Sequence, residues 1–133
     1  MQPHEACLRV RYAETDQMGI VYHSNYLIYM EVGRVELFRA AGLRYRDFER
    51  DTGLFLAVVE AGCNYLAPAR YDDEVIVRAS LGETNPRLIL IRYQIRHAET
   101  GQAIAEGFTK HIFMSREGKP KKLPEVYRDL FGM

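Results

Sequence analysis

The stretch NYLIYMEVGRVELFRAAG, residues 25–42, is the one long segment of the chain with a helical pattern. Apolar or small residues recur in it at spacings of three and four, at Tyr26, Met30, Gly33, Leu37 and Ala40. This spacing is typical of a helix that turns a single stripe toward a core. We therefore predict a helix over residues 25–41, ended by Gly42 in a left-handed conformation.

Gly33 lies in the middle of this predicted helix, where glycine is unfavourable by about 1 kcal/mol relative to alanine. We expect another backbone to approach the helix closely on the face that carries Gly33. Ser24 and Asn25 are suitable residues to cap the start of the helix. A second, shorter helix is predicted for YRDFERDT, residues 45–52.

The remainder of the chain has the pattern of strands and tight turns. One strand is predicted before the long helix, at residues 6–14, and four are predicted after it, at residues 54–68, 73–83, 87–99 and 102–115. Val75, Val77, Ala79 and Leu81 alternate with polar residues and should share one face of their strand. Turns are expected at residues 85–86 and 100–101, and a short helix is expected to begin at Pro124.

This order predicts an α+β domain that spans residues 1–133. Consecutive strands joined by tight turns favour an antiparallel sheet, and the single long helix must lie on one face of it. A five-stranded sheet around one helix leaves exposed edges and an incompletely covered face. Both features favour a dimer in which two sheets join edge to edge.

The composition argues against several classes of protein. Eighteen basic residues balance eighteen acidic ones among the 133 residues, which gives no support to binding of nucleic acid or of a membrane surface. No apolar run has the length of a transmembrane helix, so no insertion into a membrane is expected. The N-terminus lacks the apolar segment of a signal peptide, so we expect a cytoplasmic protein. Cys7 and Cys63 are expected to be buried, reduced thiols, because they lack the spacing of a zinc site.

The four histidines, at positions 4, 23, 97 and 111, form no metal-binding pair, so no metal is predicted. Asp16 and His23 flank the loop that leads into the long helix, where unpaired N–H groups carry partial positive charge. Asp16 could act as a base or nucleophile beside these donors, or could simply form a turn. His23 could polarise a carbonyl group, or could cap the helix.

The segment YAETDQMGIVYHSNYLIYMEVGRVELF, residues 12–38, resembles the signature of the 4-hydroxybenzoyl-CoA thioesterase family. A second segment, NYLAPARYDDEVIV at residues 64–77, resembles another block of that family. The similarity extends over residues 7–115 and is greatest to the small bacterial acyl-CoA thioesterases, including those encoded near Tol–Pal genes. It implies the hotdog fold, in which a curved antiparallel sheet wraps one long helix.

The resemblance also implies an activity, the hydrolysis of an acyl-CoA thioester to a free acid and coenzyme A. Asp16 matches the catalytic carboxylate of the family, acting as a nucleophile or as a general base. The N–H group of His23 matches the oxyanion donor. Gly19, Tyr22 and Tyr26 belong to the expected substrate site. Met18 replaces a residue that is often small in the family, which changes the expected shape of the pocket near the acid.

The family's site lies at a dimer interface, and many members form a homotetramer as a dimer of dimers. The resemblance therefore implies that Val59, Glu60 and Ala61 of one subunit face Asp16 of the other. It implies no cofactor, since coenzyme A is part of the substrate. On electrostatic grounds we expect its phosphates near Arg70, Arg87, Arg116 and the basic loop at residues 119–122, which includes Lys121 and could otherwise be merely solvated.

Two other functions fit the same sequence. A hotdog dehydratase or hydratase that acts on acyl thioesters would use an acid on the long helix, where Glu31 and Glu36 lie. A non-catalytic acyl-CoA-binding protein could keep the fold without the reaction. Asp16 is the residue that distinguishes a thioesterase from both.

Overall fold

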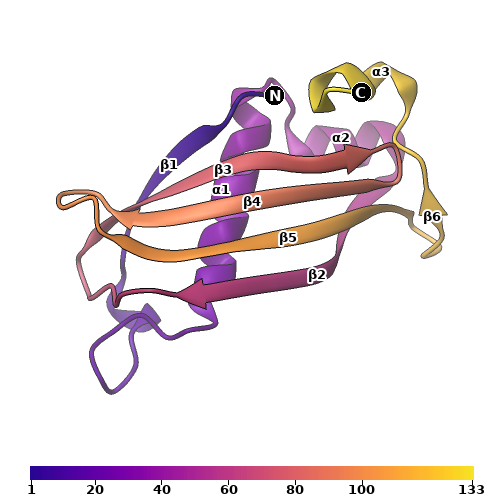
Figure 1. Ribbon diagram of the computed structural model, residues 1–133. Coiled ribbons are helices and arrows are strands. Elements are labelled where there is room, and N and C mark those ends of the chain that lie inside the picture. Colours follow the sequence, from indigo (N-terminus) through magenta and orange to yellow (C-terminus); the bar gives the residue numbers. More distant parts are fainter.

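A sheet of antiparallel strands lies across one long helix in the computed structural model, which describes residues 1–133 (Figure 1). The strands along the sheet follow the order β1-β3-β4-β5-β2, so that β1 and β2 form its two edges, and the short β6 pairs with β5. Their bounds are β1 His4–Arg9, β2 Leu54–Tyr65, β3 Glu74–Asn85, β4 Leu88–His97, β5 Ala103–Ser115 and β6 Pro120–Lys121. The antiparallel sheet and the presence of five main strands, one before the long helix and four after it, were predicted correctly.

The long helix α1 spans Asn25–Ala40, close to its predicted bounds. Its buried residues are Tyr26, Tyr29, Met30, Gly33, Leu37 and Phe38. Four members of the predicted stripe are therefore buried, whereas Ala40 is exposed. Gly42 has a φ of +85°, as expected for the left-handed end of a helix.

Gly33 lets α1 approach the sheet closely. A Cβ atom at this position would lie 2.6 Å from Cγ1 of Val77 in β3. The expectation of a close approach is confirmed, but the neighbour is a valine side chain and not a backbone. Val75, Val77 and Ala79 are fully buried on the predicted face of β3, while Leu81 is half-buried next to an irregularity in the pairing with β4.

Helices and turns cover the end of the sheet near the start of β2. The helix α2 spans Tyr45–Thr52, and the C-terminal turn comprises α3, Glu125–Arg128, and the 3₁₀ turn η2, Asp129–Phe131. The ring of Phe48 in α2 lies 5.1 Å from that of Tyr127 in α3. The ring of Phe131 lies 5.8 Å from that of Phe38 in α1. These contacts anchor both short helices on the main core.

Two local predictions were wrong. The first strand ends at Arg9, and Tyr12–Glu14 form a 3₁₀ turn, η1, because the Glu14 carboxylate accepts a 2.8 Å hydrogen bond from the Arg11 N–H. Cys7 is exposed, since it points to the face of the edge strand β1 that no other layer covers, whereas its neighbour Ala6 is buried. Cys63 is only half-buried, and both thiols are free.

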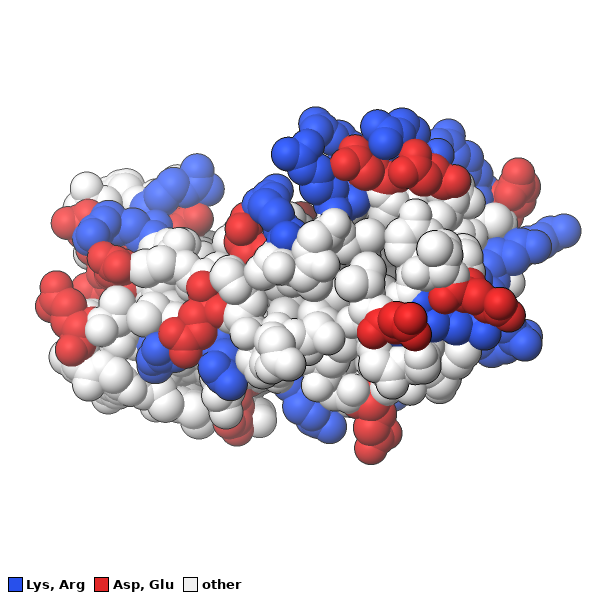
Figure 2. Space-filling model, turned by 90° about the horizontal axis from the view of Figure 1, so that it is seen from above, with Lys and Arg blue, Asp and Glu red and all other residues white.

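Charges of both signs alternate over the surface seen from above, around a largely uncharged centre (Figure 2). This mixture agrees with the formal net charge of zero. None of the helices has both the length and the apolar character needed to cross a membrane.

Candidate active site

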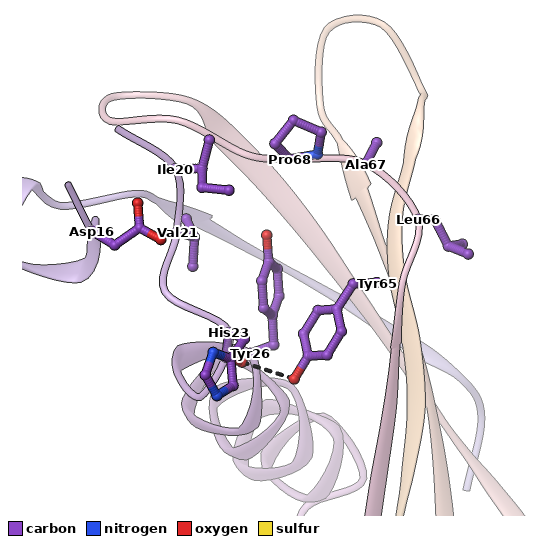
Figure 3. Close-up of a pocket in the computed structure, with 9 residues that line it drawn as sticks. All are labelled: Asp16, Ile20, Val21, His23, Tyr26, Tyr65, Leu66, Ala67 and Pro68. Atoms are coloured by element: carbon purple, nitrogen blue, oxygen red, sulfur yellow. Dashed lines mark hydrogen bonds between the residues drawn. The ribbon is translucent and has the colours of Figure 1, made fainter. Parts of the chain in front are cut away.

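A cavity of about 450 Å³ opens where the loop before α1 meets the segment after β2. The residues that line it are Asp16, Ile20, Val21, His23, Tyr26, Tyr65, Leu66, Ala67 and Pro68 (Figure 3). Both predicted catalytic residues, Asp16 and His23, and the predicted pocket residue Tyr26 thus share one cavity. The wall formed by residues 65–68 was not predicted. These residues come some 40 positions after His23 in the sequence, and only the fold brings them to the cavity.

Hydrogen bonds within the loop fix the position of Asp16. Its N–H donates to the Ile20 carbonyl at 2.9 Å, and its carbonyl accepts from the Gly19 N–H at 3.0 Å. Its Oδ1 accepts from the Met18 N–H at 2.8 Å. Gly19 has a φ of +76°, a conformation that glycine adopts without strain. The half-buried Asp16 therefore forms the expected turn with Oδ1, while Oδ2 accepts no hydrogen bond from the protein.

The start of α1 provides unpaired donors beside this carboxylate. The first helical hydrogen bonds run from the Asn25 N–H to the Tyr22 carbonyl and from the Tyr26 N–H to the His23 carbonyl, at 2.9 and 3.4 Å. The N–H groups of His23 and Ser24 donate to no protein acceptor, and the Ser24 side chain makes no capping bond. Two N–H groups at the positive end of the helix dipole are thus available to an anion.

Glu14 holds the loop against the helix. Its carbonyl accepts hydrogen bonds from the Tyr22 N–H at 2.9 Å and from Asn25 Nδ2 at 2.8 Å. Its carboxylate accepts from the Arg11 N–H at 2.8 Å and from the Tyr29 hydroxyl at 2.9 Å. Burial favours the neutral acid, but the hydrogen bonds from Arg11 and Tyr29 outweigh it and lower the pKa of Glu14.

This role of Glu14 was not predicted from the sequence. The only local signal was that Glu14 follows Arg11 by three residues. At this spacing a glutamate side chain can accept a hydrogen bond from the backbone N–H at the start of a turn. The contacts to Tyr29 and Asn25 come from the helix and required the fold to be known.

Aromatic rings form much of the cavity wall. The Tyr26 ring is buried, 5.5 Å from the Tyr65 ring, and burial raises the pKa of its phenol. The Tyr65 hydroxyl donates to the His23 carbonyl at 3.1 Å. Tyr22 lies outside the cavity lining, with its ring 4.4 Å from the His23 imidazole and 47% of its surface exposed.

The residues predicted to bind the phosphates lie in two places. Arg70 pairs with Ile20 in a short bridge, and its Nη1 lies 3.9 Å from the position of a Cβ on Gly19, beside the Asp16 loop. Arg116 and Lys121 line a separate hollow of about 470 Å³ at the start of β2. Arg87 follows β3 in the turn at that same end of the sheet.

Arg70 lies far from Arg87, Arg116 and Lys121 within one chain. The strand β2 has 12 residues and is therefore roughly 40 Å long, with the Asp16 cavity near its end and Arg116 near its start. Val59, Glu60 and Ala61 lie between them, exposed on the free edge at an irregularity between Val58 and Glu60. None of these three residues lines the cavity of its own chain.

Residues 10–131 match the family model of the thioesterase-like superfamily. The chain belongs to this superfamily. A relative described as the putative acyl-CoA thioesterase YneP of Bacillus subtilis (strain 168) is 36% identical over 123 residues, which cover 92% of this chain and 88% of the relative.

Solved structures agree with this membership. The hypothetical protein TT1821 from Thermus thermophilus is 41% identical and superimposes with a TM-score of 0.89, over 98% of this chain and 97% of that one. A DHNA-CoA thioesterase from Staphylococcus aureus is 28% identical with a TM-score of 0.91, over 99% of this chain and 88% of that one. The predicted hotdog fold and the predicted family of thioester hydrolases are confirmed.

Proposed function

We propose that this chain hydrolyses an acyl-CoA thioester to a free acid and coenzyme A, with Asp16 as the nucleophile or general base. One observation carries the proposal. A single cavity is lined by Asp16, whose Oδ2 is free, and by His23 at the start of α1, where the N–H groups of His23 and of the adjacent Ser24 have no acceptor. A thioester carbonyl between them would have a base or nucleophile on one side and oxyanion donors on the other.

Either role of Asp16 leads to the same products. As a general base, Asp16 would take a proton from a water molecule as that water attacks the thioester carbon. As a nucleophile, it would form an anhydride that water then hydrolyses. In both cases the carbonyl oxygen becomes negatively charged, and the free N–H groups at the helix start would stabilise it. The thiolate of coenzyme A leaves and is protonated.

The walls of the cavity favour an uncharged acyl group. Ile20, Tyr26, Leu66 and Pro68 present aromatic or aliphatic surface, and no lysine or arginine lines the cavity. A second acidic group on the acyl chain would therefore find no lysine or arginine among the lining residues of the same subunit.

An edge-to-edge dimer would bring Arg116 of one subunit toward Arg70 and the Asp16 cavity of the other. β2 is a free edge, and Val58 and Val59 expose about half of their surface there, 53% and 52%. Antiparallel pairing of two β2 strands about their midpoint sets the start of one opposite the end of the other. Arg116 of the partner subunit would then approach the Asp16 cavity, where it could bind phosphates of coenzyme A. We propose a homodimer of this kind as the unit that forms the site, with a homotetramer built from two such dimers.

The dehydratase alternative has less support. Neither Glu31 nor Glu36 lines the cavity, and Glu36 forms an ion pair with Arg39 on the same helix. An acid on the helix is therefore not placed beside the free N–H groups.

The substitution Asp16→Asn tests the proposal. We expect a loss of at least about a hundredfold in the release of free thiol from acyl-CoAs that range from short aliphatic to aromatic, with folding and oligomeric state unchanged. Asp129→Asn is the matched control, because Asp129 is exposed and lies outside the cavity lining. Full turnover by Asp16→Asn would contradict its catalytic role. No turnover by the unmodified chain on any acyl-CoA would favour a binding protein.

A further inference from the structure

Tyr65 connects the two walls of the cavity. It is the last residue of β2, and its hydroxyl reaches across to the segment just before α1, where it donates to the His23 carbonyl at 3.1 Å (Figure 3). Its ring packs edge-on against two neighbours, 5.5 Å from the Tyr26 ring and 6.2 Å from the His23 ring. The hydroxyl and the ring thus make separate contacts.

The accepting carbonyl belongs to a particular peptide unit. The C=O of His23 and the N–H of Ser24 are the two polar ends of the same planar amide. That N–H is one of the two unpaired donors at the helix start. A hydrogen bond to the oxygen of an amide polarises it and strengthens its N–H as a donor. The Tyr65 hydroxyl therefore bonds to the oxygen of a peptide unit whose N–H, that of Ser24, is unpaired.

Tyr65 makes the shorter of the two hydrogen bonds to this carbonyl. The other comes from the Tyr26 N–H at 3.4 Å, which is long for an N–H···O bond. A phenol has an ordinary pKa of about 10 and is therefore a donor at neutral pH. Partial burial, and then the neighbouring Cys63, raise the pKa of Tyr65 further. Phenylalanine at this position could supply the same ring contacts but not the hydroxyl.

We propose that Tyr65 is a positioning residue, whose hydroxyl orients and polarises the His23–Ser24 peptide so that the Ser24 N–H can stabilise the oxyanion. This inference rests on the proposed thioester hydrolysis. Through Tyr65, β2 would take part in the reaction at the site of its own subunit. This role is separate from the proposed role of the exposed β2 edge in dimer formation.

The substitution Tyr65→Phe tests the role in turnover. We expect kcat for thiol release to fall about tenfold, with KM and the melting temperature unchanged, because the ring stays and only the polarisation is lost. Tyr71→Phe is the matched control, since Tyr71 is exposed, its hydroxyl makes no hydrogen bond within the protein, and it lies outside the cavity lining. Wild-type kcat in Tyr65→Phe would overturn the inference and leave the proposed hydrolysis intact. A raised KM with unchanged kcat would also overturn it, because Tyr65 would then only bind substrate.

A second measurement needs no substrate. In the ¹H–¹⁵N spectrum of the free protein, Tyr65→Phe should shift the Ser24 amide, because its own peptide carbonyl loses a hydrogen bond. Tyr71→Phe should leave that signal in place. An unchanged Ser24 signal in Tyr65→Phe would overturn the inference whether or not a substrate is known. Inactivity of the unmodified chain on every acyl-CoA would instead overturn the proposed function.

Discussion

The carboxylates of Glu14 and Asp16 lie two residues apart and have different environments. Glu14 accepts hydrogen bonds from Arg11 and Tyr29, which use both of its oxygens and lower its pKa. Asp16 accepts one bond within its own loop and keeps Oδ2 free. A carboxylate whose oxygens are already bonded is a poor base, because a new proton must displace an existing donor. Asp16 is therefore the one of the two that is available for chemistry.

His111 has a buried side-chain nitrogen that lacks a hydrogen-bond partner. It is fully buried on β5, where its Nε2 lies 2.7 Å from Thr109 Oγ1, while Nδ1 has no hydrogen-bond partner. Thr109 in turn bonds to the Tyr93 hydroxyl, which accepts from Arg34 at 3.2 Å. Burial, and then the positive charge of Arg34, lower the pKa of His111 to about 4.

This pKa makes the stability of the protein depend on pH. The folded value of about 4 lies below the ordinary value of 6.5, so the unfolded chain takes up a proton first as the pH falls. The stability due to neutral His111 is complete above pH 6.5 and is lost between pH 6.5 and 4, by roughly 3 kcal/mol in all. Urea unfolding at pH 7 and pH 4.5 should show this loss, and His111→Gln should reduce the difference. An equal difference in both proteins would assign it to other groups.

The contact between α1 and β3 depends on the absence of a side chain at Gly33. We expect Gly33→Ala to lower the free energy of unfolding by about 1–3 kcal/mol, although alanine favours helix formation, because the new methyl group overlaps Val77. Urea unfolding measures the change.

The double variant provides the control for this contact. Val77→Ala alone should also be destabilising, because it leaves a cavity. Combined with Gly33→Ala it should cost less than the sum of the two single changes, since the truncation of Val77 makes room for the new methyl group, which partly fills the cavity. Additive effects would show that the two residues do not interact.

The elements differ in how far the sequence could predict them. The bounds of α1 and α2 follow from local periodicity and from the glycines at positions 42 and 53, which have positive φ. The cavity is not local, because it depends on the pairing of Ile20 with Arg70 and on the Val21 N–H bond to the Ala69 carbonyl. Asp16 and His23 could be found from the loop and helix alone, whereas the Tyr65 wall could not. Exposure of Cys7 was also unpredictable, since an alternating strand pattern does not say which face is covered.

The free edge of β2 determines the expected assembly of the protein. The unmodified chain should sediment as a dimer or a larger oligomer. Val58→Lys should shift it toward monomer and reduce thiol release, because a charge would be placed on the apolar edge. Val126→Lys is the matched control, since Val126 is 80% exposed on α3, away from this edge. A stable and fully active monomer would contradict a site shared between subunits.

The strand order has a consequence for the synthesis of the protein. The N-terminal half of the chain provides α1 and both edge strands, β1 and β2, which do not pair with each other. Their partners, β3 and β5, come later in the sequence, so the first half leaves the ribosome without a strand to pair with. The apolar stripe of α1 must stay uncovered until β3–β5 have emerged. We therefore expect the nascent chain to depend on chaperones until translation is nearly complete.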